Sequence, residues 1–191
     1  FGFNQVAYSG LETGNRDRAS YVLEQGKIRM IFSTPLNSNN EMSEHIKAHG
    51  DGVKDIAFHV DDAKACYEAC IARGAKSAGE PENISDDNGS ITKASIYTYG
   101  ETIHSFISHN DYSGPFLPGF QEKIIEGNTA GLRFIDHIVG NVELGKMDDW
   151  VKFYANIMGF TQLQAFSDDD ISTEYSALMS KVMESDNGRI K

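Results

Sequence analysis

The sequence predicts an α+β fold built from a duplicated unit, in which a strand and a helix are followed by antiparallel strands. The opening segment FGFNQVAYSG is similar to MGFTQLQAFSD, which begins at Met158, and SYVLEQGKI, from Ser20, is similar to SKVMESDNGRI, from Ser180. Both matches keep their order and an offset of about 160 residues, which indicates an internal duplication. Glycine outnumbers proline by 18 to 4, which favours short elements joined by turns over a helical bundle.

The composition excludes several classes of protein. With 40% hydrophobic and 24% charged residues, the chain is typical of a soluble globular protein, and its net charge of −11 argues against nucleic acid or anionic lipid as a partner. No segment reaches the roughly 20 apolar residues of a membrane span, and no leader opens the chain. Cys66 and Cys70 lack the Cys-x-x-Cys spacing of a redox pair, so we interpret them as reduced core thiols in a cytoplasmic protein. Apolar or strand-like runs stand at both ends, and we expect the chain to be truncated there.

The first copy shows the repeated unit most fully. Val53–Val60 has the composition of a strand, and Asp61 and Asp62 can cap a helix that continues to Arg73, with Gly74 ending it in the left-handed conformation. The segment EPENISDDNGS has the composition of turns. The segments ITKASIYTYG and ETIHSFISH then predict two strands joined by a short turn.

The second copy begins with the same two elements. Residues 132–141 predict a buried strand, and an apolar stripe at helical spacing predicts a helix over 147–158 that ends at Gly159. Residues 113–131, rich in glycine and proline, predict a linker packed over the surface. We therefore expect an N-terminal domain over 1–112, a linker over 113–131 and an incomplete second domain over 132–191.

Most of the six histidines are expected to be structural. His45 and His49 are four residues apart near a probable helix end, a spacing that can bind metal, but no glutamate follows them as in a zinc protease. We interpret this pair as a solvated helix terminus. His59, His104 and His109 have no second ligand at a convincing spacing, and they are interpreted as structural too.

His137 differs because of its place in the predicted strand 132–141. Alternation puts Ile135, His137 and Val139 on one face and Asp136 on the other. An imidazole on the inner face of a sheet can present a ring nitrogen to a cavity, where it suits iron, zinc or copper. A satisfied core histidine remains the alternative. Asp136, facing away, is assigned a structural hydrogen bond and not proton transfer.

Six motifs carry a resemblance to a known family: GLETGNRD, HGDGVKDIAF, RGAK, FLPGF, FIDHIVGNV and TEYSALMSKVM. They occur in order and span nearly the whole chain, which resembles the 4-hydroxyphenylpyruvate dioxygenase family. The resemblance implies a vicinal-oxygen-chelate fold, of the glyoxalase and bleomycin-resistance type, made of duplicated βαβββ modules. It implies a metal-free N-terminal domain whose first strand and helix are missing, and the first module of a catalytic domain.

The resemblance also implies an Fe(II) cofactor bound by two histidines and one glutamate. His137 matches the first histidine, and the other two ligands are expected beyond Lys191, so the site should be empty and this chain alone inactive. In the first copy, Asp55 stands where the second imidazole would be, and Phe106 or a neighbour replaces the carboxylate. Ser180 matches a serine of the substrate pocket, and Val139 should form pocket wall.

The implied activity of the full-length protein is conversion of 4-hydroxyphenylpyruvate and O₂ to homogentisate and CO₂ in tyrosine catabolism. A cytoplasmic homo-oligomer, a dimer or a tetramer, is expected. Two alternatives remain open. One is 4-hydroxymandelate synthase, which shares the fold, the substrate and the iron site. The other is a metal-free binding or dimerisation module of the same fold, in which His137 belongs to the core.

Overall fold

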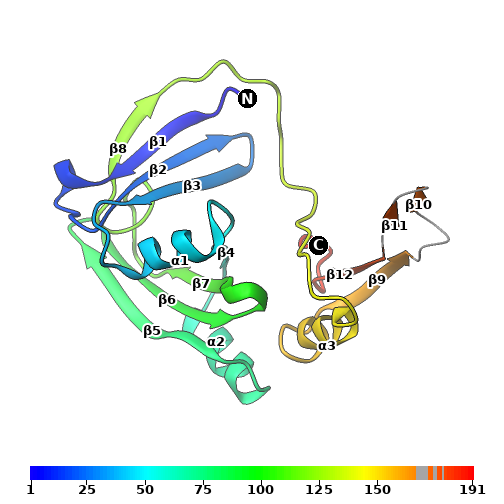
Figure 1. Ribbon diagram of the computed structural model, residues 1–191. Coiled ribbons are helices and arrows are strands. Elements are labelled where there is room, and N and C mark those ends of the chain that lie inside the picture. Colours follow the sequence, from blue (N-terminus) through cyan, green and yellow to red (C-terminus); the bar gives the residue numbers. More distant parts are fainter. Residues whose placement is uncertain (167–171, 174–175, 178) are drawn as a thin grey trace.

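The computed structural model describes residues 1–166, 172–173, 176–177 and 179–191 and confirms the α+β class (Figure 1). Its helical elements are η1 (Leu11–Thr13), α1 (Glu41–His49), α2 (Ala63–Ala72), η2 (Tyr99–Glu101) and α3 (Met147–Asn156). Its strands are β1 (Asn4–Ser9), β2 (Arg18–Gln25), β3 (Ile28–Pro35), β4 (Asp55–His59), β5 (Ser77–Asp86), β6 (Gly89–Tyr97), β7 (Ile103–His109), β8 (Gln121–Ile125), β9 (Thr161–Phe166), β10 (Ser172–Thr173), β11 (Ser176–Ala177) and β12 (Ser180–Glu184). Among the described residues, no helix is long and apolar enough to cross a lipid bilayer.

The first sheet has the strand order β3-β2-β1-β8, and all its neighbours are antiparallel. β8 lies inside the segment 113–131, for which the sequence predicted only an irregular linker. It pairs with the free edge of β1, with Gln5 opposite Ile125 and Tyr8 opposite Gln121. Part of the linker is therefore a strand, because pairing satisfies backbone groups that an open edge would leave to water.

The second sheet has the order β4-β7-β6-β5, in which β4 and β7 are parallel and the other neighbours antiparallel. The prediction of turns throughout EPENISDDNGS is wrong, since Ser77–Asp86 forms the edge strand β5. The turn is confined to the residues that join β5 to β6, where Asn88 N donates to Asp86 Oδ1 and Gly89 has φ +114°. An edge strand tolerates polar residues and proline because one side of its backbone needs no partner.

The helix α2 packs on the second sheet and forms the main core with it. Its N-cap is Asp62, whose side chain accepts from Ala65 N, and Gly74 adopts φ +100° after its end, as predicted. The buried cluster joins α2, β6, β7 and the end of α3, and its members are Ala63, Tyr67, Cys70, Ala94, Ile96, Phe106 and Ile157. Both cysteines are free, and burial raises the pKa of the Cys70 thiol, consistent with a reduced core thiol.

The end of α3 docks onto the N-terminal half of the chain. Arg73 Nη1 donates to the carbonyl of Ile157 at 3.1 Å. His104 Nε2 lies 3.0 Å from Tyr154 Oη, and His104 Nδ1 lies 3.2 Å from the carbonyl of Ile56. Burial lowers the pKa of His104 and raises that of Tyr154, so the neutral imidazole donates from Nδ1 and accepts from the tyrosine.

Backbone pairing supports the duplication inferred from the sequence. β1 pairs with β2 through Asn4↔Glu24, Gln5↔Leu23 and Ala7↔Val22, and β9 pairs with β12 through Thr161↔Glu184, Gln162↔Met183 and Gln164↔Val182. Each of these β9 residues lies at the same sequence offset from its β1 counterpart, and each of these β12 residues lies at the same offset from its β2 counterpart. The irregularity that skips Val6 recurs at Leu163. A shared register with a shared bulge indicates one structural unit used twice.

The prediction of a buried strand over 132–141 is wrong for this chain. Residues 126–143 run as an extended segment outside any helix or strand, along the right of the first sheet in Figure 1. In the first copy, β4 pairs with β7, the third strand after the helix α2. After α3, the described residues form the pair β9 and β12 and the short pair β10 and β11. Among the described residues, no strand pairs with residues 132–141, so this segment joins no ladder.

Candidate functional site

His137 lies in the extended segment 126–143 with its ring exposed to solvent. Its side chain is 58% exposed, and Nδ1 lies 2.8 Å from Asp136 Oδ2. Ile138 N donates to the carbonyl of Lys191 at 3.1 Å, which places the segment beside the chain that follows β12. The described part of the chain supplies one imidazole here. The sole group of three or more His, Cys, Asp or Glu that it brings within ligating distance lies elsewhere, in the N-terminal half.

Asp136 does not face away from His137, as strand alternation predicted. The alternation does not apply because the segment is not a pleated strand, and the two side chains meet. The hydrogen bond from His137 lowers the pKa of the Asp136 carboxyl, which is therefore ionised at neutral pH. The structural hydrogen bond assigned to Asp136 is present, and its partner is the candidate ligand itself. A carboxylate on Nδ1 orients the ring and leaves Nε2 as the nitrogen that can serve as a ligand.

The two candidate pocket residues, Val139 and Ser180, lie on different segments of the chain. Val139 is 68% exposed, two residues beyond His137. Ser180 opens β12, is half-buried and pairs with Phe166 of β9. The structure brings the His137 segment and the chain after β12 together through the bond of Ile138 to Lys191. Within the described chain, Val139 is not part of a buried pocket wall.

Asp55 and Phe106, the first-copy positions, are held in structural contacts. Asp55 accepts from Ser105 Oγ at 2.6 Å and from Ser105 N at 3.2 Å, while Lys93 Nζ lies 3.8 Å from the carboxylate. Phe106 is buried in the core against α2. Both side chains are therefore engaged by their neighbours in the first copy.

The structure brings together a histidine pair and a carboxylate that the sequence did not connect. His45 and His49 lie on α1 as predicted, but Glu101 of η2 reaches them from 52 positions further along the chain, with Oε2 3.0 Å from His49 Nε2. The ligand atoms of all three lie within 4.8 Å of one another. Local spacing could not reveal this group, because η2 joins β6 to β7 and meets α1 only in the folded chain.

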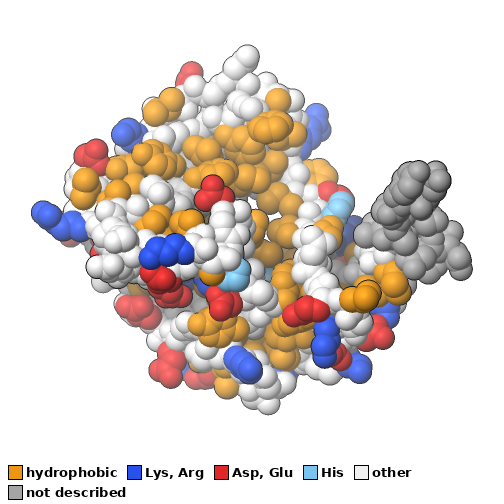
Figure 2. All heavy atoms as spheres, viewed as in Figure 1, with side chains coloured by type: hydrophobic (Ala, Val, Ile, Leu, Met, Phe, Trp, Pro, Cys, Tyr) orange, Lys and Arg blue, Asp and Glu red, His pale blue; other side chains and the backbone are white. Residues whose placement is uncertain are grey.

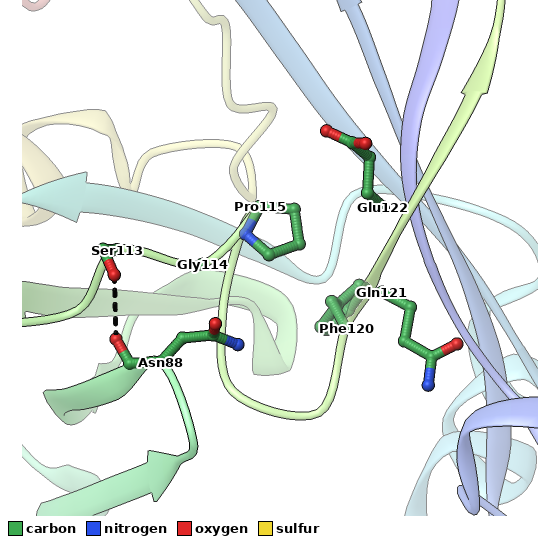
Figure 3. Close-up of a pocket in the computed structure, with 7 residues that line it drawn as sticks. All are labelled: Asn88, Ser113, Gly114, Pro115, Phe120, Gln121 and Glu122. Carbon is green, nitrogen blue, oxygen red and sulfur yellow. Dashed lines mark hydrogen bonds between the residues drawn. The ribbon is translucent and has the colours of Figure 1, made fainter.

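A surface pocket lies where the segment after β7 crosses the β5–β6 turn (Figure 3). It has a volume of about 410 Å³, and Ser113 Oγ donates to the carbonyl of Asn88 at its edge. Its lining residues are Asn88, Ser113, Gly114, Pro115, Phe120, Gln121 and Glu122. None of the candidate residues at His137, Val139 or Ser180 lines it, so we do not assign it to the site.

Comparisons with known proteins agree over the whole chain. No family model matches the sequence. A 4-hydroxyphenylpyruvate dioxygenase from Dictyostelium discoideum is 41% identical and one from Yarrowia lipolytica 40% identical, each aligned over 100% of this chain. The chain is homologous to 4-hydroxyphenylpyruvate dioxygenases. It covers 54% and 51% of these two relatives, about half the length of the curated dioxygenases that it matches.

Solved structures support the fold. A triple mutant of 4-hydroxymandelate synthase from Streptomyces coelicolor superimposes with a TM-score of 0.83 at 21% identity, covering 98% of this chain and 53% of the other. A fusion of a xylose isomerase-like TIM barrel with a 4-hydroxyphenylpyruvate dioxygenase superimposes with a TM-score of 0.66 at 18% identity, covering 99% of this chain and 27% of the other. At these identities the likeness concerns the fold, and it agrees with the predicted vicinal-oxygen-chelate architecture.

Proposed function

We propose that the protein containing this chain is an Fe(II)-dependent dioxygenase that converts 4-hydroxyphenylpyruvate and O₂ to homogentisate and CO₂. The observation that carries the proposal is the identity of 41% and 40% to two named dioxygenases over the whole chain. The 4-hydroxymandelate synthase has a similar fold but only 21% identity. The sequence comparison therefore favours the dioxygenase.

His137 is proposed as one iron ligand. Its Nδ1 is hydrogen-bonded to Asp136, which leaves Nε2 for a metal, and ligating histidines usually have such a carboxylate on the other ring nitrogen. The exposed ring fits a site completed by further residues, and we assign the second histidine and the glutamate to a part of the protein outside this chain. Bound iron would supply oxygen activation and chelation of the α-keto acid.

The remaining residues of this chain would shape the site. Asp136 would hold the imidazole in one tautomer and orientation, and so keep Nε2 directed at the ion. Val139, two residues further on, is proposed as apolar pocket wall, and its exposure of 68% leaves it free to be covered by substrate or by another domain. Ser180 is proposed as a hydroxyl that lines the pocket.

The proposal includes a cytoplasmic homo-oligomer, either a dimer or a tetramer. Two unpaired cysteines are consistent with a reducing compartment. Figure 2 shows hydrophobic side chains gathered in the upper half of the view, where Figure 1 draws the first sheet. Exposed apolar residues of that sheet include Met30, Ile31 and Phe32 of β3 and Ile124 and Ile125 of β8. Large exposed apolar patches are typical of surfaces that become covered.

The test uses the whole protein that contains this chain, assayed with Fe(II), O₂ and 4-hydroxyphenylpyruvate. Homogentisate is the expected product, and His137→Ala should abolish both its formation and stoichiometric iron. His59→Ala, at an exposed histidine of β4, is the matched control and should retain both. Formation of 4-hydroxymandelate would support the synthase instead. Unchanged iron content in His137→Ala would reject His137 as a ligand. Absence of bound iron from the parent protein would favour a metal-free module.

A further inference from the structure

We propose that His45, His49 and Glu101 bind a divalent transition ion of the Zn²⁺ type, at a site separate from the iron site proposed at His137. The proposal does not depend on the dioxygenase activity. It places a metal in the N-terminal half of the chain, for which the sequence predicted none.

The three side chains converge from two elements. His45 and His49 are one helical turn apart on α1, with ring centroids 4.5 Å apart. Glu101 Oε2 lies 3.0 Å from His49 Nε2 and 3.8 Å from His45 Nδ1. One helix supplies two imidazoles, and a distant turn supplies a carboxylate. Three protein ligands of this kind can form a metal site with one open position.

The spacing is close to what a metal needs. Ligands bound at 2.0–2.2 Å around a tetrahedral ion lie about 3.4 Å from one another. One measured pair is slightly shorter and one slightly longer than this, and all three ligand atoms lie within 4.8 Å of one another. Small rotations of exposed side chains would close the difference. Imidazole nitrogen with one carboxylate suits zinc, cobalt or copper better than calcium or magnesium.

An orphaned nitrogen provides the second observation. His45 Nδ1 is buried and has no hydrogen-bond partner among the described residues, although the His45 side chain is 15% exposed as a whole. Buried polar atoms nearly always have a partner, and those without one call for an explanation, which can be an ion. Burial is the main factor that lowers the pKa of His45.

The turn that carries Glu101 is already held in place. Glu101 has φ +63°, and it is the one non-glycine residue with positive φ in the described chain. Lys54 Nζ donates to the Glu101 carbonyl at 2.6 Å, which fixes the backbone and puts a positive charge near the site. Glu41 and Glu101 oppose that charge with two carboxylates close enough to raise the pKa of His45. The local charges therefore do not exclude a cation.

An ion here would connect α1 to η2, and η2 contacts the second half of the chain. Tyr99, two residues before Glu101, packs edge-on against Trp150 of α3 with ring centroids 5.2 Å apart. A bound ion would therefore stabilise the N-terminal half and the turn against which α3 packs. The expected effect is a melting temperature that rises with the free metal concentration.

The experiment titrates the whole protein in a His137→Ala background with Zn²⁺ by equilibrium dialysis, and with Co²⁺ by visible absorption. We expect one equivalent of Zn²⁺ and a d–d band typical of tetrahedral Co²⁺. His49→Ala and Glu101→Ala should each weaken Zn²⁺ binding by more than about 10-fold. Loss of a residue that hydrogen-bonds to a metal ligand already lowers metal affinity by about that factor, and loss of a ligand itself should lower it at least as much. Both side chains are exposed, so both variants should fold.

His59→Ala is the matched control. His59 lies beside His109 with ring centroids 5.2 Å apart, and no carboxylate completes that pair among the described residues. The control should bind Zn²⁺ unchanged, and metal-free thermal melts of all variants should coincide. Absence of Zn²⁺ binding in this background, or binding that is equal in His49→Ala, Glu101→Ala and the parent, would overturn the proposal. Neither outcome bears on homogentisate formation by the unmodified protein.

Discussion

At the scale of single residues, the contact between Asp136 and His137 decides how the candidate iron ligand is presented. A histidine held on Nδ1 offers Nε2 in a fixed direction, whereas a free ring must be oriented by the metal itself. The contact joins neighbours in sequence, and it forms in an extended segment that lies outside any helix or strand. The orientation of the His137 imidazole is thus set by its neighbour in sequence and does not require the other metal ligands.

Asp136→Asn should weaken iron retention in the whole protein. The amide keeps the shape of the side chain but loses the charge that favours the Nδ1–H tautomer, so we expect iron affinity to fall about 10- to 100-fold. Iron content after dialysis against a graded chelator measures this. Asp149→Asn, which removes an exposed carboxylate bonded to Lys146, should leave iron unchanged. Equal retention by both variants would show that Asp136 does not support the ligand.

At the scale of elements, the β2–β3 turn anchors the start of the extended segment. Gly26 has φ +60°, and a Cβ there would meet the carbonyl oxygen of Arg133 at 2.6 Å. Lys27 N donates to that same carbonyl, and Leu132 N donates to Gln25 Oε1 at 2.7 Å. A turn of the first sheet therefore holds the chain that leads to His137.

Gly26→Ala should destabilise the protein by about 1–3 kcal/mol, because it adds a backbone clash to the cost of a left-handed alanine. Gly14→Ala separates the two effects. Gly14 has φ +86° with nothing within 4 Å of its Cβ position, so that variant has only the conformational cost, about 1 kcal/mol. Urea unfolding midpoints measure both, and similar losses in the two variants would contradict the close approach to Arg133.

The docking of α3 depends on a buried hydroxyl. Tyr154→Phe removes the partner of His104 Nε2 and leaves a buried nitrogen without a hydrogen bond. Such a loss costs about 1–3 kcal/mol. Chemical denaturation should show it, whereas Tyr21→Phe, at an exposed position on β2, should be nearly neutral. An unchanged midpoint in Tyr154→Phe would mean that water or another group satisfies His104.

At the scale of the whole molecule, the buried histidines should make stability fall in mild acid. Burial lowers the pKa of His104, as it does those of His45 and His109, below the 6.5 of an unfolded histidine. Below pH 6.5 the unfolded chain therefore binds more protons than the folded chain. The stabilisation is complete above that pH and is lost as the pH falls towards the folded values.

We expect the free energy of unfolding to decrease from pH 7.5 to pH 5, above the range in which most carboxylates titrate. His104→Gln should lower stability at pH 7.5 but should also flatten this slope, because one of the depressed histidines is gone. Urea denaturation at several pH values gives both quantities. A slope that is identical in the variant, or stability that rises on acidification, would contradict the assignment of His104 as a neutral core residue.

Much of the fold could be predicted from the sequence because it depends on local patterns. The helices α2 and α3, the caps at Asp62 and Gly74 and the duplication all follow from spacing and turn chemistry. The segments where prediction failed are those whose state depends on a partner strand. β5 and β8 become strands because the edge of a neighbouring strand lies beside them, whereas residues 132–141 meet no such edge among the described residues.

The same division holds for the sites. The sequence by itself determined the α+β class and the repeat, since both are written in residue order and spacing. The candidate ligand His137 follows from the resemblance of its motif to a known family. Only the tertiary structure decided that Asp136 bonds to that histidine and that Glu101 meets His45 and His49 across 52 or more positions. Side chains far apart in the chain become ligands of one site only when sheets and turns bring them within a few ångströms, and no local periodicity encodes that distance.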